Sequence, residues 1–569
     1  FTIDNPVLGR SKKSGVSFTP QATFFNEATA DASNISVNCT ITRLGDATII
    51  FNDTKSIVSL SAFSSIQTTF SSVNAGSLTA GEYSVTVSAS LAGDGDNSND
   101  TTSYNFTVKD PLSGILTVGD VQMYTSITSA INDLKDVGIG SSVTLKLLNE
   151  VYNETSPISI SGISGVNRTT TLTFKPEISS TININGTSSE PWGLRIRGVE
   201  GVIIDGSTTS KGNDRSLTIN ATGVYGKYGI LLDTSTSPRT QYNILKNVKV
   251  TTGASAVISG TGYYGIWLNG SNNKDTANEI INCDITNFGE AGIRTDKQHQ
   301  LILKNNIIHD WTQSAGATTV RGIWLRTGTT SSQVLANIIN NIVNEVNANG
   351  SIGIANEIGT GSSLLCANNM ISGIRAVGAG GGANIARGIY SNASNQNDSY
   401  YYNSINLNGS DASTSTTSRS ACFEFGLGAT NPKFQNNIFV NTMTFGDNTS
   451  THSFGYYFIT LPSGATLNYN DIYIPTGAIG YDGTIRTSIN DWISTGRDIN
   501  SASSDPKFVG NSDLHIRSDV RTVSESWGNP TGITGVIDVD IDGNVRYGSA
   551  GYNGQSAIGA DVGADEGDF

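Results

Sequence analysis

Residues 291–308, AGIRTDKQHQLILKNNII, decide the fold of this chain. The segment carries a Gly-Ile pair that begins at Gly292, and an asparagine within an apolar strand follows 14 residues later at Asn306. The next segment, residues 322–339, reads GIWLRTGTTSSQVLANII and holds the same two features in the same order. Because both copies consist of short strand-like runs without helical periodicity, they indicate a repeating β unit.

Both features recur along most of the chain. Clear Gly-Ile pairs begin at Gly229, Gly265, Gly292, Gly322, Gly353 and Gly388, and looser copies begin at Ala421 and Gly455. Each pair is followed 14 to 18 residues later by one member of a series of asparagines: Asn247, Asn282, Asn306, Asn337, Asn369, Asn403, Asn437 and Asn470. Successive asparagines are mostly 31 to 35 residues apart, which is a period typical of a solenoid.

The type of solenoid follows from the content of one repeat. No unit contains a helix-length apolar pattern, which excludes arrays of paired helices and leucine-rich repeats. The antiparallel hairpin turns of a propeller blade are missing as well. A parallel β-helix fits, with coils stacked about 4.8 Å apart and apolar residues pointing inward. We expect the asparagines to occupy a turn and to bond one another from coil to coil, as a structural ladder.

The regions outside the repeat predict further parts of an all-β fold. Alternating apolar residues and regular turn signals over residues 19–110 predict an immunoglobulin-like β-sandwich. Residues 1–18 have no evident place in it, so we interpret them as a linker or as a strand donated to a neighbouring copy. Helical spacing over residues 124–137 predicts a short helix that caps a β-helix placed at residues 111–510. We expect residues 511–569 to form a C-terminal cap.

The composition excludes several functions. The 569 residues carry a formal net charge of −14, which argues against nucleic acid as a partner, because binding phosphates needs a basic face. No apolar run approaches the roughly 18–20 residues that span a bilayer. No secretory signal is present at Phe1, so we expect a mature form of a secreted or cell-surface chain. Four histidines and four scattered cysteines argue against a zinc or iron–sulfur site. We expect buried free thiols at Cys39, Cys283, Cys366 and Cys422.

Two regions resemble a known family. Tyr124-Thr-Ser-Ile-Thr-Ser-Ala-Ile-Asn-Asp-Leu, followed by Val143-Thr-Leu and Val151-Tyr-Asn-Glu, resembles the opening of secreted right-handed parallel β-helix surface proteins of Gram-negative bacteria. Near the end, the chain is similar to the same family at Asp505-Pro-Lys-Phe-Val, Asp513-Leu-His-Ile, Asp540-Ile-Asp-Gly-Asn-Val-Arg and Ile558-Gly-Ala-Asp-Val-Gly-Ala-Asp-Glu. The resemblance implies a right-handed β-helix behind a β-sandwich, outside the cell. That family holds carbohydrate-active enzymes, adhesins and structural proteins, so it does not choose among these functions.

The repeat register predicts which side chains face the solvent. In each Gly-Ile strand, the residues two and four places after the glycine point outward. Across neighbouring coils these positions include Trp267, Arg294, Trp324 and Tyr390. Exposed aromatic rings stack on sugars and arginines hold acidic or hydroxyl groups, so we expect a polysaccharide to bind along this face. The alternative is that loops of neighbouring coils cover the aromatic residues as a second core.

Catalysis on the same face is a further hypothesis. Its weak candidates, within two or three coils of one another, are Arg294, Asp296, Arg326 and Glu357. An arginine beside Ca²⁺-binding acidic residues would suit a polysaccharide lyase, as in the β-helix lyases that the fold resembles, and paired carboxylates would suit a glycoside hydrolase. No motif of either class is present residue by residue, so we lean toward a protein that is not an enzyme.

Two acidic segments are weak candidates for Ca²⁺, the one cofactor that we consider. They are Asp94, Asp96 and Asp100 in a Gly-rich loop, and Asp538, Asp540 and Asp542 before a turn. Neither segment has the full register of an EF-hand loop, and a solvated loop or a polar strand explains each as well.

The sequence therefore predicts an extracellular structural or adhesive surface protein, either a self-assembling filament subunit or a carbohydrate-binding adhesin. The alternative is a polysaccharide lyase or glycoside hydrolase that acts on the outward face of the β-helix. An enzyme would need an open groove in which Arg294, Asp296 and Arg326 converge.

Overall fold

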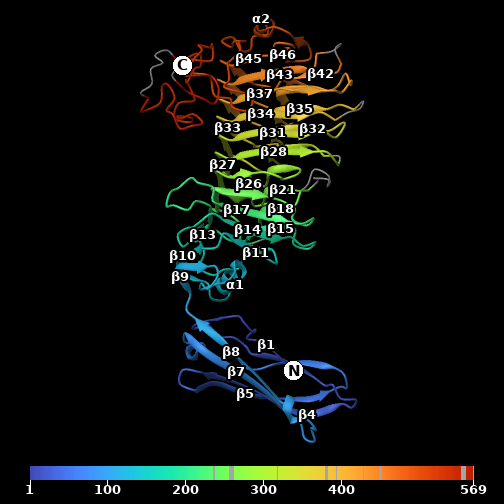
Figure 1. Ribbon diagram of the computed structural model, residues 1–569, viewed down its shortest axis with the longest axis vertical. Helices are drawn as coiled ribbons and strands as arrows, with labels where there is room; N and C mark the ends of the chain where they lie inside the picture. The colour runs from blue at the N-terminus through green and yellow to red at the C-terminus, as the bar shows by residue number, and fades with distance from the viewer. Residues whose placement is uncertain are drawn as a thin grey trace. The chain divides into compact units, whose positions relative to one another are not determined.

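The computed structural model describes all residues except 235–236, 255–261, 317, 379–381, 393, 427, 448–450, 553–558 and 568–569. The chain divides into two compact units (Figure 1). Unit 1 comprises residues 1–145 and 161–172, and unit 2 comprises residues 146–160 and 173–569.

Unit 1 contains two sheets that share one apolar core, so a β-sandwich is confirmed. The smaller sheet has the strand order β1-β3-β6, and the larger has the order β2-β8-β7-β4-β5. Phe24, Val37 and Tyr83 are among the buried residues that the two sheets contribute to the core. The strands are β1 (Thr2–Asn5), β2 (Lys12–Lys13), β3 (Gln21–Phe25), β4 (Ala32–Arg43), β5 (Thr48–Leu60), β6 (Ser65–Thr69), β7 (Gly81–Ser90) and β8 (Thr101–Lys109).

Helix α1 (Ile127–Val137) confirms the predicted helix and contacts both β2 and β9 (Leu112–Val118). Ser126 caps its N-terminus by accepting a hydrogen bond from the backbone N–H of Ser129. Gly138 ends the helix with a φ of 74°, a conformation that favours glycine. The boundary between the compact units falls at residues 145–146, whereas β9 already belongs to a 12-stranded sheet of the solenoid.

The prediction that residues 1–18 form a linker or a donated strand is wrong. Strand β1 pairs with β3 of this chain's own sandwich, and β2 pairs with β8. Phe1 and Phe18 pack on the sandwich core, and Arg10 Nη2 lies 2.6 Å from Asp136 of α1. Both strands of this segment are therefore already paired within one chain and are not a free strand for a neighbour.

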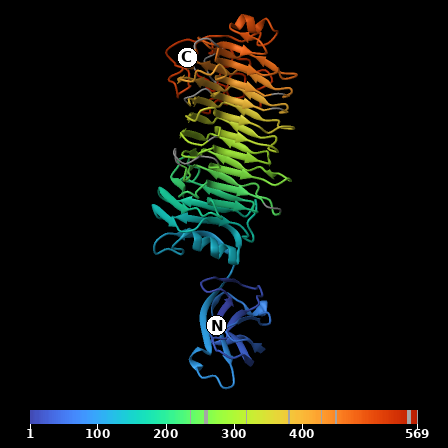
Figure 2. The same ribbon diagram turned by 90° about the vertical axis from the view of Figure 1, so that its right-hand side faces the viewer.

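Unit 2 is a parallel β-helix, which confirms the predicted solenoid (Figures 1 and 2). Each coil contributes one short strand to each of three parallel sheets. In one coil these are β25 (Ala291–Asp296) in the third sheet, β27 (Ile302–Lys304) in the first and β28 (Ile307–Gln313) in the second. Residues 291–308 thus reach all three sheets.

The other strands of unit 2 follow the same order. In the first sheet they are β13 (Leu172–Pro176), β16 (Val202–Asp205), β19 (Ile244–Lys246), β23 (Glu279–Ile281), β30 (Gln333–Leu335), β33 (Leu365–Ala367), β36 (Ser399–Tyr401), β40 (Lys433–Gln435) and β44 (Thr466–Asn468). In the second they are β11 (Val151–Glu154), β14 (Ser180–Asn185), β17 (Leu217–Thr222), β20 (Val248–Thr251), β24 (Asp284–Ile285), β31 (Ile338–Asn344), β34 (Met370–Ala376), β37 (Ser404–Leu407), β41 (Ile438–Asn441) and β45 (Asp471–Tyr473). In the third they are β12 (Ile158–Ile160), β15 (Trp192–Arg197), β18 (Tyr228–Asp233), β21 (Tyr264–Asn269), β29 (Val320–Leu325), β32 (Gly350–Asn356), β35 (Ile385–Ser391), β39 (Arg419–Phe425), β43 (Ser453–Phe458), β46 (Ala478–Tyr481) and the antiparallel β47 (Ile485–Arg486).

The glycines of the Gly-Ile pairs stack above one another in the third sheet, where they have no room for a side chain. A Cβ built on Gly322 would lie 2.6 Å from Cγ2 of Ile339 and 2.7 Å from the carbonyl oxygen of Gly353 in the next coil. Ile339 stands two places after the ladder asparagine Asn337. This contact between two sheets explains why the Gly-Ile pair and the asparagine recur together.

The asparagine ladder is confirmed from Asn306 to Asn470. Each of these side chains is at most 1% exposed, and each Nδ2 up to Asn437 donates to Oδ1 of the next asparagine at 2.9 to 3.0 Å. Asn337 Nδ2 also donates to the carbonyl of Leu303, and its Oδ1 accepts from the backbone N–H of Asn306. The buried amides are thus hydrogen-bonded in full, as their burial requires.

The first two predicted members, Asn247 and Asn282, are not in the ladder. Their φ angles are 61° and 51°, and strand register aligns them with Asn305, the residue before the ladder position. Cys283 takes the ladder position of that coil, because its backbone N–H donates to Oδ1 of Asn306. Asn282 Nδ2 instead donates to Oδ1 of Asn247 at 2.7 Å, which makes a separate pair at the corner.

We expect the substitution Asn369→Ala to lower the free energy of unfolding of the β-helix by about 3 kcal/mol, because it removes the acceptor of two buried donors on Asn337. Urea denaturation measures the change. The control is Asn183→Ala, since Asn183 is only half-buried and bonds Asn153 and Asn220 on the outer face, where water can replace the lost partners. Equal losses in the two variants would contradict a special role for the buried ladder.

The C-terminal end of the coil is covered by helix α2 (Ile489–Ile493), which the sequence analysis did not predict. Trp492 is fully buried and stacks on Tyr456, with 5.5 Å between ring centroids. Its ring also lies where a side chain on Gly480 would be. The helix therefore shields the last apolar layer from water.

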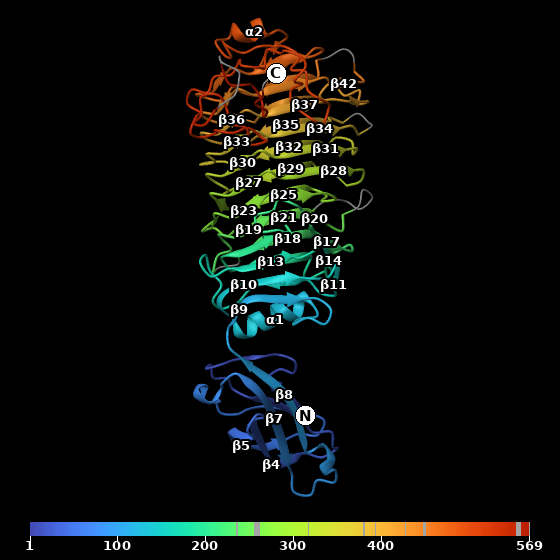
Figure 3. The same cartoon turned by 60° about the vertical axis from the view of Figure 1, so that its left-hand side comes forward.

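Residues 511–552 and 559–567, here called the flank segment, pack along the side of the coils, which corrects the predicted C-terminal cap (Figure 3). Ile533 packs against Tyr401 and Tyr402 at the corner after β36, and Leu514 packs against Met370 of β34. The segment has few regular elements, so no periodic pattern in the sequence indicates its position.

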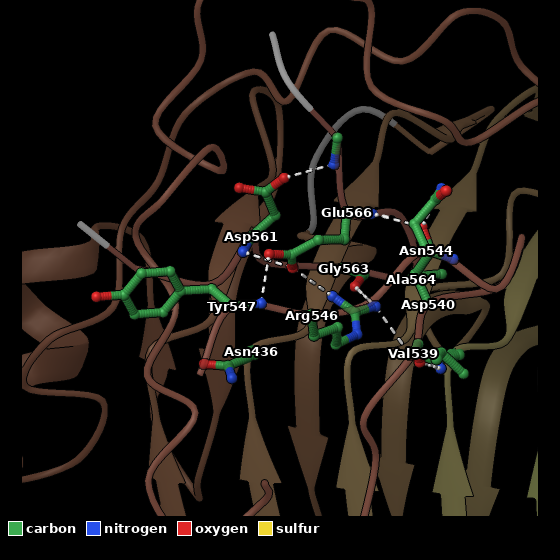
Figure 4. A network of polar contacts seen from close by, with 12 residues as sticks. Asn436, Val539, Asp540, Asn544, Arg546, Tyr547, Asp561, Gly563, Ala564 and Glu566 are labelled. Carbon is green, nitrogen blue, oxygen red and sulfur yellow. Dashed lines mark hydrogen bonds and ion pairs between the residues drawn. The ribbon is translucent and has the colours of Figure 1, made fainter. Parts of the chain in front are cut away.

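A buried ion pair fixes the flank segment (Figure 4). Arg546 is 1% exposed, and its Nη1 donates to Oε2 of Glu566 at 3.0 Å. Its Nη2 donates to Oδ1 of Asn368, the corner residue between β33 and β34, and its Cζ lies 3.8 Å from the ring centroid of Tyr402. Burial, followed by the charge of Glu566, raises the pKa of Asp561 to about 7. The guanidinium of Arg546 thus joins the flank segment to the coils.

All four cysteines are buried and free, as predicted. Burial raises the pKa of Cys283 to about 12 and raises the pKa of the other three thiols as well. The thiols are therefore inert packing groups.

Candidate functional site

The outward face of the third sheet carries three columns of side chains. The residue before each stacked glycine forms the leading column, the second residue after it forms the middle column, and the fourth forms the trailing column. The middle column reads Leu231, Trp267, Arg294, Trp324, Ala355, Tyr390, Glu424, Tyr457 and Tyr481. The predicted outward placement is confirmed as far as Tyr390.

One expected member of this face points inward. Counting from Ala421 places Phe423 outward, but Phe423 is fully buried and pairs in register with Ile389. The loose copy therefore begins at Cys422, and the outward residue of that coil is Glu424.

Arg294 is the centre of the face. Its guanidinium carbon lies within 5.0 Å of three ring centroids, those of Tyr264, Trp267 and Trp324. Its Nε donates to Oδ2 of Asp296 at 2.8 Å, and its Nη1 donates to the hydroxyl of Tyr264. Burial lowers the pKa of Arg294, but the hydrogen bond to Asp296 and the charge of that carboxylate outweigh burial and raise the pKa above its ordinary value. Arg294 is therefore a fixed cation and a poor base.

Asp296 joins three coils around Arg294. It accepts a hydrogen bond from Trp267 Nε1 at 2.8 Å, and Arg326 Nη1 lies 3.3 Å from its other oxygen. The candidates Arg294, Asp296 and Arg326 thus converge, as the enzymatic hypothesis requires. Their polar groups already have partners in one another, and this suits the positioning of a bound anion more than proton transfer.

Glu357 belongs to the adjoining cluster. Trp324 Nε1 donates to Oε2 of Glu357 at 2.7 Å, and Arg321 lies 3.7 Å from Oε1. The guanidinium of Arg321 stacks 3.9 Å from the ring centroid of Trp324. Arg321 was not among the predicted site residues, because it stands before the glycine and the predicted outward positions all follow the glycine. The position before each glycine would have indicated it, because the leading column includes Tyr228, Tyr264, Arg321 and Arg387.

The aromatic residues of this face partly cover one another. Trp324 is 8% exposed, and Trp267 and Tyr390 are half-buried. With Tyr264 and Ala355 they form one packed cluster, whose members all lie on the third sheet. The alternative of a second core is therefore correct for Trp324, although side chains of the same sheet, and not loops, form it.

Two arginines share one carboxylate farther along the same face. Arg387 Nη2 and Arg419 Nη2 each donate to Oε1 of Glu424 at 2.9 Å, and Glu424 is 1% exposed. Burial raises the pKa of Glu424, but the charges of the two arginines outweigh it and hold the pKa below its ordinary value. The group therefore carries one positive charge in excess.

A hollow of about 520 Å³ adjoins this group at the C-terminal end of the face. Tyr457 and Tyr481 line the hollow and stack with 4.8 Å between ring centroids and 16° between ring planes. Arg419 lies 4.4 Å from the ring centroid of Tyr457, and the exposed residues Thr416 and Thr417 contribute to the rim. The hollow offers half-buried rings, hydroxyl groups and a cation to a ligand.

The predicted Ca²⁺ candidates mostly shape turns. Asp94 accepts from the backbone N–H of Asp96, and Asp96 accepts from that of Ser98. Asp540 Oδ1 accepts from two backbone N–H groups, and Asp538 accepts from Gly535 and Ser549. Among the described residues, only Asp542 of the six candidates belongs to a group with metal-ligand spacing, and Ca²⁺ binding stays a prediction.

Comparisons with known proteins identify no family. No family model matches the chain, and no curated protein matches its sequence. Among solved structures, PfbA, a surface adhesin of Streptococcus pneumoniae, is 13% identical with a TM-score of 0.38, over 60% of this chain and 80% of that chain. A PL6 family polysaccharide lyase from Pseudopedobacter saltans is 13% identical with a TM-score of 0.37, over 72% and 96%. A Family 28 exopolygalacturonase of Yersinia enterocolitica is 10% identical with a TM-score of 0.23, over 84% and 99%. In the described part of the chain, no helix has the length and apolar character to cross a membrane.

Proposed function

We propose that this chain is an extracellular glycan-binding surface protein whose binding face is the outer side of the third sheet. The observation that carries the proposal is the hollow beside Tyr457 and Tyr481. Flat aromatic rings bury the apolar faces of sugars, and nearby hydroxyl groups exchange hydrogen bonds with sugar hydroxyls. We propose an immunoglobulin-like topology for the sandwich of unit 1.

The charge of the hollow favours an acidic polysaccharide. Arg387 and Arg419 share the single carboxylate of Glu424, so one positive charge remains beside the tyrosine pair. A sugar carboxylate or sulfate would pair with that charge through the planar guanidinium of Arg419. Binding is favoured over cleavage because the arginines and carboxylates of the face hold one another in place.

We expect the substitution Tyr457→Ala to weaken binding of an acidic polysaccharide at least tenfold, since it removes half of the stacked pair. Affinities are measured by calorimetry on a panel of acidic and neutral polysaccharides, and Arg419→Met should reduce affinity for the acidic members alone. The matched control is Tyr225→Ala, since Tyr225 is 47% exposed on a loop of unit 2. Unchanged affinity in Tyr457→Ala, or no binding to any member of the panel, would contradict the proposal. Release of new reducing ends or of an unsaturated product would assign the face to an enzyme.

A further inference from the structure

We propose that His515, Asp542 and Asp565 form a binding site for a divalent transition metal in the flank segment. One ligand atom from each of the three side chains lies within 4.8 Å of the others. His515 and Asp542 are 27 residues apart in the chain, so folding of the segment brings the group together. The glycan-binding face uses none of these residues, and the proposal is independent of it.

The orientation of His515 is the second observation that supports a metal. Its Nδ1 contacts the carboxylate of Asp513, while its Nε2 lies 2.9 Å from Oδ2 of Asp542. A histidine that ligates a metal usually donates its other ring N–H to a carboxylate, which fixes the tautomer and the ring plane. Asp513 would fill that supporting role, and Nε2, which now faces Asp542, would lose its proton and act as the ligand.

Asp565 supplies a preordered third ligand. It is 6% exposed, and its Oδ2 accepts a hydrogen bond from the backbone N–H of Ile516 at 3.0 Å. A buried carboxylate needs a charged partner or a metal. The side chains of His515 and Asp542 are 32% and 55% exposed, so water can complete the coordination shell from the open side.

The ligand set selects the kind of metal. Ca²⁺ and Mg²⁺ take oxygen ligands, whereas one imidazole with two carboxylates suits Zn²⁺ or a similar ion. Four histidines and four scattered cysteines are too few for a site made of histidine and cysteine alone, but carboxylates can complete the ligand set around one histidine. The structure assembles a mixed site from three short motifs near the end of the chain: Asp513-Leu-His, Asp540-Ile-Asp and Ala564-Asp-Glu.

The test is a Zn²⁺ titration of the full chain after chelator treatment and dialysis, followed by calorimetry. We expect one Zn²⁺ per chain, affinity at least tenfold weaker in His515→Ala and in Asp542→Asn, and affinity about tenfold weaker in Asp513→Asn. Bound Zn²⁺ should also raise the melting temperature of the flank segment, because it joins separate stretches of the folded state. Circular dichroism checks the fold of each variant. Because the side chain of Asp542 is exposed, we expect Asp542→Asn to leave the packing of the core unchanged.

His309 provides the matched control. Its Nε2 lies 3.0 Å from Asp284 and its Nδ1 lies 2.7 Å from Asp310, so it too stands between two carboxylates. It is not part of a three-ligand group among the described residues. His309→Ala should leave Zn²⁺ affinity unchanged. The proposal fails if the wild-type chain binds no Zn²⁺, if His515→Ala binds it with undiminished affinity, or if His309→Ala and His515→Ala lose affinity equally. Binding of Ca²⁺ that is as tight as Zn²⁺ would likewise overturn the imidazole as a ligand.

Discussion

Replacing Arg546 by methionine is expected to lower the free energy of unfolding of the flank segment by about 3–5 kcal/mol. The substitution keeps most of the side-chain volume but removes the cation that Glu566 and the ring of Tyr402 contact. Glu566 then remains as a buried charge without its partner, and such a group costs far more than the pair contributes when intact. Hydrogen exchange measured residue by residue separates the flank segment, which should exchange faster, from the coils, which should change less.

The pH dependence separates lost charge from lost packing. Burial raises the pKa of Glu566, and Asp561 beside it has a pKa of about 7. An acid whose folded-state pKa is raised stabilises the folded state most while it is protonated, and this contribution is lost as pH rises through the folded pKa. Without Arg546 both pKa values should rise further, so the deficit of the variant should grow between pH 5 and pH 8.

Arg517→Met is the matched control for this prediction. Arg517 also belongs to the flank segment and pairs with Asp519 at 2.7 Å, but its side chain is 46% exposed. Water replaces the lost partner of an exposed pair, so we expect no measurable change in exchange. An Arg546→Met variant that behaves like Arg517→Met at both pH values would show that the buried pair does not hold the flank segment.

The parts of the fold that could be predicted from the sequence are those encoded by a repeated local contact. The glycine stack, the ladder from Asn306 and the outward columns each return once per coil, so their period is visible in one sequence. Asn247 and Asn282 were placed in the ladder because asparagine serves both the ladder and the left-handed corner before it. Residue type alone cannot separate two adjacent positions that suit the same side chain.

The remaining parts depend on contacts between distant segments that occur once. Arg546 is hydrogen-bonded to Asn368, which lies 178 residues away in the chain. Strand β1 pairs with β3, and no repeated pattern in the sequence indicates this pairing. The same reason applies to the candidate sites. Arg294 and Asp296 lie in the periodic columns and were predicted, whereas the group around His515 forms only when separate motifs of the irregular flank segment meet.

Replacing Gly322 by valine is expected to destabilise the β-helix by more than about 3 kcal/mol, or to prevent its folding. A Cβ at this position would meet Ile339 of the same coil and the backbone of Gly353 in the next coil. Because the backbone of one coil is hydrogen-bonded to both neighbours, the strain cannot be relieved by a single side chain. Urea denaturation measures the loss, and Gly510→Val is the control, since a Cβ on Gly510 meets nothing within 4 Å.

A double variant, Gly322→Ala with Ile339→Ala, shows whether the contact with Ile339 or the contact with Gly353 causes most of the destabilisation. Removing the isoleucine side chain relieves one contact and leaves the carbonyl of Gly353 2.7 Å from the new Cβ, so we expect partial rescue relative to Gly322→Ala alone. Full rescue would mean that side-chain packing, and not the spacing of the coils, requires glycine here. Cys422 shows that the glycine position can carry a side chain, because it is aligned with Gly388 of the preceding coil. In the coil of Cys422, Phe439 stands where the preceding coil has Ile405. The glycine position of the third sheet therefore accepts a Cβ in a coil where the isoleucine position of the second sheet has also changed. We expect substitutions at these two positions to be coupled in their effect on the free energy of unfolding.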